Sequence, residues 1–132
     1  MREILFRGKT ENGEWYEGLL WKKKYKTDKL FISCFPDKDD NEEVFVVDKE
    51  TVGQFTGLTD KNGTKIFEGD IVKGYLGYGD NENNIAYIKY EEDSIGFVLV
   101  EILKEDYGKY FEISDDVEVI GNIHDSPELL EV

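Results

Sequence analysis

The chain has 132 residues, of which 39% are hydrophobic and 14% aromatic, and this composition predicts one folded domain rather than a disordered chain. Its formal net charge of −14 argues against nucleic acid and membranes as partners, because both present anionic surfaces. The single cysteine, Cys34, excludes an internal disulfide and any zinc site that needs several thiolates. Since Cys34 lies in the apolar run 30–35, we expect a buried side chain rather than a reactive thiol.

The N-terminal sequence MREILFRGK carries charged residues where a signal peptide needs an uninterrupted apolar stretch. No apolar run in the chain approaches the ~20 residues of a membrane-spanning helix. We therefore expect a soluble protein of the cytoplasm.

The charges are distributed unevenly along the chain. Residues 1–30 contain eight basic and five acidic side chains, whereas the remaining residues contain 8 basic and 25 acidic ones. The first part is therefore slightly cationic and the rest strongly anionic, and we expect most of these charges to face solvent.

Alternation of apolar and polar residues with a period of two predicts strands in the first half of the chain. The first two strands are expected to pair as a hairpin around the turn at 10–13, and an acidic loop occupies 36–43. The predicted strands of this half are 4–7, 15–21, 30–35, 44–47 and 51–57.

In the second half, Asp60-Lys61-Asn62-Gly63 predicts a type I turn with a glycine bulge, closing a hairpin over 58–67. A loop is expected at 77–84, and Pro127 to Leu130 is expected to form one helical turn. The predicted strands of this half are 71–76, 85–90, 96–103, 107–113 and 117–123.

These elements predict an all-β fold in which N-terminal antiparallel strands pack on a C-terminal SH3-like small β-barrel, with a short C-terminal helical turn. We interpret residues 1–132 as a single domain with two lobes, 1–57 and 58–132.

Residues that resemble catalytic groups have simpler structural explanations. His124 is the only histidine and lies beside Asp125 and Ser126, but the members of a catalytic triad come from separated segments. Glu68 and Asp70 lie two residues apart and would share one face of a strand as a carboxylate pair or Mg²⁺ site. The glycine between them and the start of a strand account for both residues structurally.

Two further motifs lack residues that calcium binding or phosphate binding requires. The acidic run 37–43 lacks the glycine that an EF-hand needs at its sixth position. The glycines at 74, 77 and 79 are not followed by Lys-Ser or Lys-Thr, nor by a predicted helix whose N-terminus could hold phosphate. We therefore predict no enzymatic activity, no cofactor and no metal site.

Aromatic residues and lysines are interleaved between residues 15 and 31, a pattern typical of single-strand nucleic-acid binding. The same aromatics alternate as core residues would, and the chain as a whole is anionic. As a candidate nucleic-acid or partner surface we take Trp15, Trp21, Lys22, Lys23, Lys24 and Tyr25.

Three blocks of the sequence resemble one known family. They are MREILFRGK with Trp15 after it, VGQFTGLTDKNGTKIFEGDIV from Val52 to Val72, and VIGNIHDSPELL from Val119 to Leu130. Together they are similar to the YopX family of phage and prophage proteins. The segment from about Lys73 to Glu118 carries less of the resemblance.

The resemblance implies a mostly β, barrel-containing fold, a phage or prophage origin and a place in the host cytoplasm. It implies no activity and no catalytic residue. The recurring positions are mostly turn and strand-start residues, except Gln54, which has no assignable turn role. They are Gly53, Gln54, Gly57, Asp60, Gly63, Glu68, Gly69, Asp70, Gly121 and Asn122.

The functional hypothesis is a non-enzymatic phage or prophage accessory protein that binds a host or phage protein, or itself, with no membrane partner. Self-association would bring Lys22 to Lys29 of one copy against the acidic residues 37–43 of another. The alternative is an accessory role in nucleic-acid metabolism. There the protein would bind single strands through its basic aromatic segment, or mimic DNA with its acidic surface.

Overall fold

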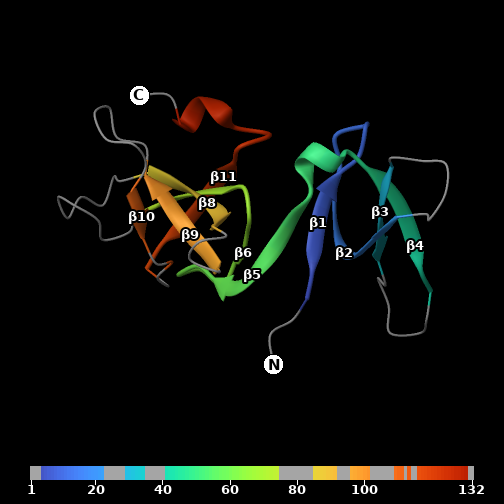
Figure 1. Ribbon diagram of the computed structural model, residues 1–132, viewed down its shortest axis with the longest axis horizontal. Helices are drawn as coiled ribbons and strands as arrows, with labels where there is room; N and C mark the ends of the chain where they lie inside the picture. The colour runs from blue at the N-terminus through green and yellow to red at the C-terminus, as the bar shows by residue number, and fades with distance from the viewer. Residues whose placement is uncertain are drawn as a thin grey trace. The chain divides into compact units, whose positions relative to one another are not determined.

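A computed structural model describes residues 4–22, 29–34, 41–74, 85–91, 96–101, 109–111, 113 and 116–130. These residues form antiparallel strands and two single-turn 3-10 helices, so the predicted all-β class is confirmed (Figure 1). The chain forms two compact units, 1–55 and 56–132.

The strands and 3-10 helices follow one another along the chain in this order: β1 (Phe6–Lys9), β2 (Trp15–Lys22), β3 (Leu30–Cys34), β4 (Glu43–Val47), η1 (Lys49–Thr51), β5 (Gly53–Thr59), β6 (Lys65–Phe67), β7 (Asp70–Lys73), β8 (Ile85–Glu91), β9 (Gly96–Glu101), β10 (Lys109–Phe111), β11 (Glu118–Asn122) and η2 (Pro127–Leu130).

The first unit is an antiparallel sheet with the strand order β4-β3-β2-β1-β5. A turn at 10–13 joins β1 to β2, and Gly13 adopts a φ of 86°, which favours glycine. Gln54, to which the sequence assigned no role, pairs with Phe6 across the β1–β5 ladder. Among the residues that the structure describes in both units, no helix is long and apolar enough to cross a membrane.

The sheet of the first unit curls so that β1 and β4 approach each other. A Cβ added to Gly8 on β1 would lie only 2.7 Å from Val47 Cγ2 on β4, although these strands are not neighbours in the sheet. The amide of Asp48 also donates to the carbonyl of Lys9 at 2.8 Å. The concave inner face therefore buries Ile32 and Val47 completely or nearly so.

The strands of this unit that differ most from the sequence prediction are β1 and β5, each of which lies two residues further along the chain. β1 runs from Phe6 to Lys9 rather than over 4–7, because Lys9 still pairs with Trp15. β5 begins at Gly53 rather than at 51, because Thr51 ends a 3-10 turn. The Thr51 hydroxyl donates to the carbonyl of Asp48 at 2.6 Å and accepts from the Lys9 amide at 2.8 Å.

The second unit contains a five-stranded antiparallel sheet of order β10-β9-β8-β7-β11 and the hairpin of β5 and β6. Its side chains form an apolar cluster, in which Val72 and Ala86 face each other across the β7–β8 ladder. The members of this core are Ile66, Val72, Ala86, Ile88 and Val117. The more specific expectation of an SH3-like barrel stays a prediction.

The predicted turn at 60–63 forms, with Gly63 at a φ of 82° and its amide donating to the carbonyl of Asp60 at 3.0 Å. The Asp60 carboxylate accepts three backbone hydrogen bonds. Oδ1 takes the amides of Asn62 and Thr64, and Oδ2 takes the amide of Val119, all at 2.9 Å. One buried carboxylate thus fixes the hairpin and ties it to β11, 59 residues further along the chain.

Gly69 joins three segments of the second unit. Its φ is 92°, its amide donates to the Ile88 carbonyl at 2.9 Å, and its carbonyl accepts from the Ile123 amide at 2.8 Å. The neighbouring Asp70 carboxylate accepts the Phe67 amide at 2.8 Å. The glycine and the aspartate therefore shape the turn that leads into β7.

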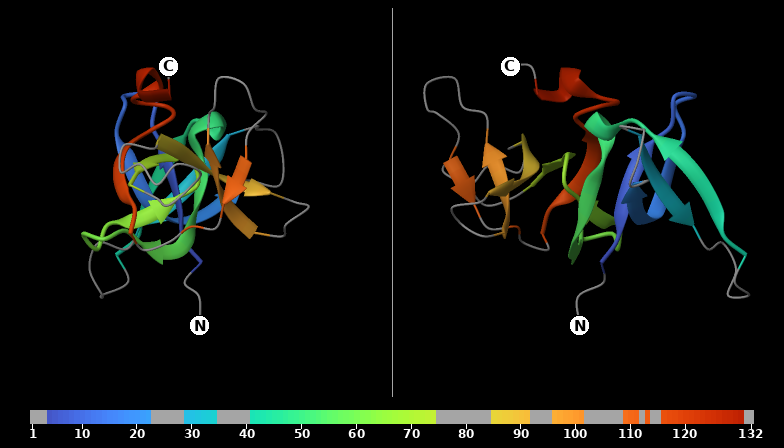
Figure 2. Two further views of the ribbon diagram at one scale, coloured as in Figure 1. Left: turned by 90° about the vertical axis from the view of Figure 1, so that its left-hand side faces the viewer. Right: turned by 45° about the vertical axis from the view of Figure 1, so that its right-hand side comes forward.

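The C-terminal turn η2 folds over β11 (Figure 2). A Cβ added to Gly121 would meet Leu129 at 3.0 Å and Ser126 at 3.1 Å. The expected helical turn at 127–130 is confirmed and takes the 3-10 form.

Candidate functional site

His124 and its neighbours build a turn. The Asn122 side chain accepts from the backbone amides of His124 and Asp125 through Oδ1 and donates from Nδ2 to the Asp125 carboxylate. The Ser126 amide donates to the Asn122 carbonyl, and Ser126 Oγ would lie 3.1 Å from a Cβ added to Gly121. This local geometry accounts for the motif without a nucleophile and a base facing each other.

Glu68 and Asp70 do not form an open carboxylate pair. Asp70 is 1% exposed and accepts the Phe67 amide, whereas Glu68 lies in the preceding turn and is half-buried. The residues that the structure describes contain no group of three or more histidine, cysteine or acidic side chains able to hold a metal ion.

Cys34 lies half-buried at the end of β3, where its thiol donates to the carbonyl of Glu17 at 3.0 Å. Burial raises the pKa of this thiol, and the negative charge of Glu43 raises it further. The protonated form is therefore favoured, which is the opposite of what an activated cysteine nucleophile needs.

The convex side of the first sheet carries two rows of side chains from β2, β3 and β4. The register sets Trp21, Phe31 and Val46 side by side on β2, β3 and β4. A second row, two residues along each strand, consists of Leu19, Ser33 and Val44. Because facing residues of paired strands point to the same side, these six residues form one surface, here called the outer face.

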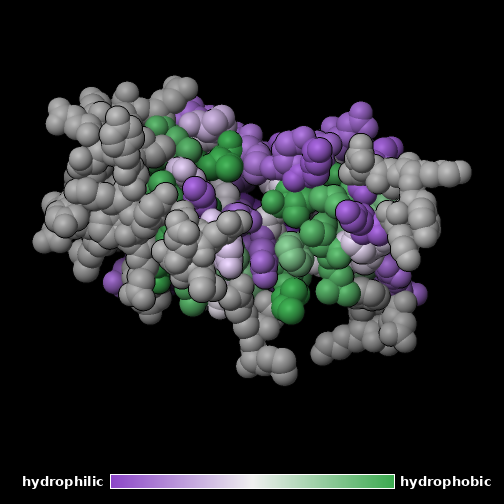
Figure 3. All heavy atoms as spheres, in the orientation of Figure 1, coloured by the Kyte–Doolittle hydropathy of each residue, from purple (hydrophilic) through white to green (hydrophobic). Residues whose placement is uncertain are grey.

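The outer face is apolar and open to solvent. Leu19 is 52% exposed, Val44 46%, Val46 44% and Trp21 37%. In the space-filling view, hydrophobic side chains come to the surface over the first unit (Figure 3). Contiguous exposed apolar side chains of this kind mark interaction surfaces more often than isolated ones do.

Trp21 is held in place on the outer face by two contacts. Its ring stacks on Phe31, with centroids 4.5 Å apart and planes 16° apart. Its Nε1 donates to Ser33 Oγ at 2.7 Å, and Ser33 Oγ donates to the Glu42 carboxylate at 2.6 Å. The only polar atom of the indole is thus satisfied within the chain, and the exposed part of the ring is apolar.

Trp15 has a different environment. It is half-buried, and the Arg7 guanidinium lies 4.8 Å from its ring centroid, with the Lys9 ammonium at 6.0 Å. Lys9 faces Trp15 directly in the β1–β2 ladder, and Arg7 faces Glu17. Through these cation–π contacts the Trp15 ring packs against side chains of β1 within the first unit.

The structure describes three of the six residues predicted as a candidate surface. Trp15 and Trp21 lie on the same side of β2, since they are six positions apart, and Lys22 is exposed at the end of the strand. Lys23, Lys24 and Tyr25 lie outside the described residues. Sequence reasoning missed Ser33 and the four other apolar members of the outer face: Leu19, Phe31, Val44 and Val46.

The sequence nonetheless contained a pattern that indicates these four apolar residues. The strand segments 19–21, 30–32 and 44–47 are apolar at successive positions, so both sides of each strand are hydrophobic. A sheet that curls around its own inner face can bury only one of the two sides.

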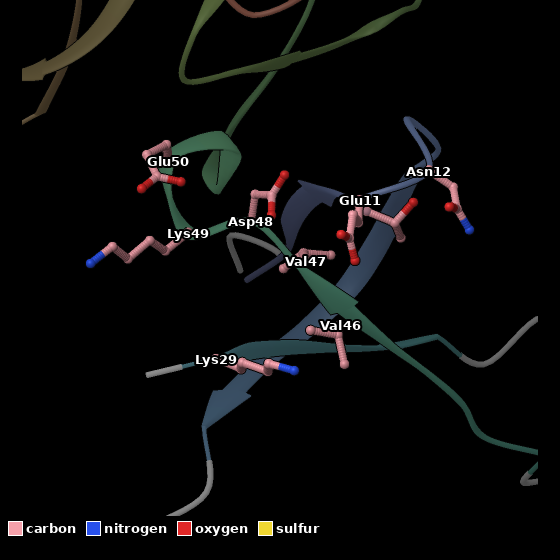
Figure 4. A pocket seen from close by; sticks show the side chains of 9 residues that line it. Glu11, Asn12, Lys29, Val46, Val47, Asp48, Lys49 and Glu50 are labelled. Atoms are coloured by element: carbon pink, nitrogen blue, oxygen red, sulfur yellow. The ribbon is translucent and has the colours of Figure 1, made fainter. Parts of the chain in front are cut away.

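A hollow of about 570 Å³ lies at the C-terminal end of β4. The turn after β1, the residue before β3 and the segment around η1 line it, and their side chains carry both signs of charge (Figure 4). It borders the outer face at Val46. Its charged lining residues are Glu11, Lys29, Asp48, Lys49 and Glu50.

Fold and site together define an all-β protein of two small units with an exposed apolar, aromatic surface on the first. The family described as YopX protein matches residues 5–131, so the chain belongs to the YopX family, as its sequence motifs predicted. A similar solved structure is the crystal structure of protein EF1440 from Enterococcus faecalis, with a TM-score of 0.56 and 26% sequence identity. The match covers 99% of this chain and 100% of that one. No curated protein matches.

Proposed function

We propose that this chain is a non-enzymatic accessory protein of phage or prophage origin that acts in the host cytoplasm by binding protein through the outer face. The observation that carries the proposal is the row of Trp21, Phe31 and Val46 beside Leu19 and Val44, with both valines and the leucine close to half exposed. Family membership supports the phage or prophage origin.

The fixed position of Trp21 favours a role in binding. Tryptophan is enriched among the residues that dominate binding energy in protein interfaces. Because Phe31 and Ser33 already hold the ring, a partner that docks on it does not have to order a mobile side chain. The indole N–H needs no partner of its own, so an apolar surface of another protein suits it.

Nucleic-acid binding has weaker support. The Glu17 carboxylate lies between Trp15 and Trp21 on the same side of β2, and Glu42 reaches Ser33 beside Trp21. The first unit contains 10 basic and 12 acidic side chains, and the second contains 6 and 18. A phosphate backbone following the two tryptophans would therefore meet carboxylates instead of an unbroken basic track.

The test compares three tagged forms of the full chain in lysate of a prophage-carrying host, with and without nuclease treatment: wild type, Val46→Glu and the control Leu58→Glu. Leu58 is 45% exposed but belongs to the second unit, so it matches Val46 in exposure and in apolar character and lies in the other unit. We expect a defined protein that wild type and Leu58→Glu retain and Val46→Glu loses. Equal retention by all three forms, or recovery of nuclease-sensitive material alone, contradicts the proposal.

A DNA-mimic role would give a different pattern in the same experiment. DNA-binding proteins would be retained by all three forms, because the acidic side chains of the second unit are unchanged in each.

A further inference from the structure

The hollow at the end of β4 is built from three segments that lie apart in the sequence. Its walls are the turn between β1 and β2, the residue before β3 and the segment that runs from the end of β4 into η1 (Figure 4). Val46 and Val47 give it an apolar lining, and Val47 is only 4% exposed. Its volume of about 570 Å³ falls within the range of small-molecule sites in proteins.

Hydrogen bonds hold the wall formed by the β1–β2 turn against the wall formed by η1. The amide of Asp48 donates to the carbonyl of Lys9 at 2.8 Å, and the amide of Lys9 donates to Thr51 Oγ1 at 2.8 Å. The turn itself is closed by the amide of Gly13, which donates to the carbonyl of Thr10 at 2.9 Å. These walls are therefore in place without a ligand, and binding does not have to order the backbone around the hollow.

Two carboxylates reach the hollow from these walls. Glu11 lies in the β1–β2 turn and Asp48 directly after β4, and both side chains lie beside Val47 (Figure 4). Within the part of the chain that the structure describes, neither carboxylate has a hydrogen-bond donor or a cation as its partner. A cationic group of a ligand can therefore take both of them as acceptors without breaking an existing contact.

A cation lines the other side of the same hollow. Lys29 precedes β3, and its side chain lies on the side of Val46, away from the two carboxylates (Figure 4). The side chain of Lys49, by contrast, extends from η1 away from the other lining residues (Figure 4). The hollow therefore has an anionic side, an apolar middle and a cationic side.

We infer that the hollow binds a small zwitterionic molecule, whose ammonium group is held by Glu11 and Asp48 and whose carboxylate is directed to Lys29. The carbon skeleton of the ligand then lies on Val46 and Val47. A molecule with two positive charges would meet the lysine, and a molecule with two negative charges would meet the carboxylates, so one charge of each sign fits best. A free amino acid and a short peptide with free ends share this chemistry. The inference goes beyond the proposed docking of protein, because it concerns a small ligand in a separate site.

The first test is an NMR titration of the isotope-labelled full chain with glycyl-leucine, a zwitterion with an apolar side chain, at low ionic strength. Two matched probes each lack one charge, since N-acetyl-glycyl-leucine has no ammonium group and glycyl-leucinamide has no carboxylate. We expect saturable shifts of the amides around the hollow, such as those of Val47 and Asp48, below about 20 mM glycyl-leucine. Both analogues should bind about threefold more weakly or worse, because each loses one attraction between charges near the surface. Free leucine in a parallel titration distinguishes an amino acid from a peptide as the preferred ligand.

The second test removes one charge of the site at a time, in Asp48→Asn and in Lys29→Gln. The controls Asp116→Asn and Lys65→Gln make the same changes at exposed positions of the second unit. The dissociation constant of glycyl-leucine should rise about threefold or more in the first pair and stay unchanged in the controls. Asp48→Asn should also reduce the penalty for acetylating the ligand, and Lys29→Gln the penalty for amidating it, because the charge removed from the ligand has then lost its partner. The amide spectra show at the same time whether each variant is folded.

The result that overturns the inference is the absence of saturable shifts around the hollow up to about 20 mM glycyl-leucine. Binding that is equally tight for the acetylated or the amidated analogue also overturns it, because only one charge of the ligand is then recognised. The same holds for binding that Asp48→Asn or Lys29→Gln leaves unchanged. These variants leave the outer face as it is, so a failure here does not decide whether that face docks protein.

Discussion

The indole Nε1 of Trp21 lies 2.7 Å from the hydroxyl oxygen of Ser33, which donates in turn to Glu42. This chain of hydrogen bonds runs along the solvent side of β3 and orients a large ring that is still 37% exposed. A side chain fixed in this way is prepared for contact with another surface. The relationship leads to the first prediction.

Ser33→Ala should reduce the free energy of unfolding by about 1 kcal/mol, because the Trp21 N–H loses its acceptor while the β3 ladder is kept. In a Trp15→Phe background Trp21 is the only tryptophan, and its emission should then shift on the Ser33→Ala change. Chemical denaturation and fluorescence measure the two effects. An unchanged spectrum and stability would show that the hydrogen bond does not hold the ring.

Asp60 should contribute stability that is lost in acid. Burial alone would raise the pKa of Asp60, but the amides of Val119, Thr64 and Asn62, aided by Lys61, hold the pKa below its usual value. A carboxylate with a lowered pKa in the folded state stabilises the fold above its unfolded pKa. That contribution disappears as the pH falls through the folded pKa.

Asp60→Asn should therefore lower the free energy of unfolding by about 2 kcal/mol or more near neutral pH, since an amide group replaces the oxygen that accepts from Val119. The difference from wild type should shrink in acid. Denaturation series at several pH values measure both, with the exposed Asp116→Asn as control. A deficit that is constant with pH would contradict the assigned role.

Gly8 should tolerate no larger residue unless Val47 is also reduced. A Cβ at position 8 would lie 2.7 Å from Val47 Cγ2, so Gly8→Ala should cost about 1–3 kcal/mol of stability through overpacking. In a Val47→Ala background the same change should cost less, because the obstructing methyl groups are gone. Additive costs in this double-mutant cycle would show that β1 and β4 do not meet there.

Cys34 should react slowly with thiol reagents. Its pKa is raised, first by burial and then by Glu43, so the thiolate fraction at a given pH lies below that of an ordinary cysteine. Glu43→Gln should speed the reaction moderately by removing the repelling charge. Rates of reaction with a disulfide reagent against pH test this, and a rate above that of free cysteine at neutral pH would contradict it.

The sequence predicted local features well where local chemistry determines them. The Asp60 to Gly63 turn and the short helical turn at 127–130 depend on residues that are neighbours in the chain, and both form. The alternation within 30–34 also placed Ile32 and Ser33 on opposite sides of β3.

Features that depend on distant segments were not predictable in the same way. Period-two alternation does not show that β1 and β4 meet through Gly8 and Val47, which lie far apart in the sequence. Without that curl, neither side of β2 and β4 is identifiable as inner or outer. Leu19, Phe31, Val44 and Val46 were therefore not recognised as surface residues, and the candidate surface was assigned to Trp15, Trp21, Tyr25 and three lysines.

The central claim is that the outer face of the first unit docks protein, and photo-crosslinking in host cells tests it most directly. A photoreactive amino acid is placed at position 46 in one form of the full chain and at position 58 in another; the two sites are equally exposed and lie in different units. The account predicts a protein adduct from position 46, with a second copy or another protein, and none from position 58. Adducts of equal yield at both positions, or none at position 46, would contradict it.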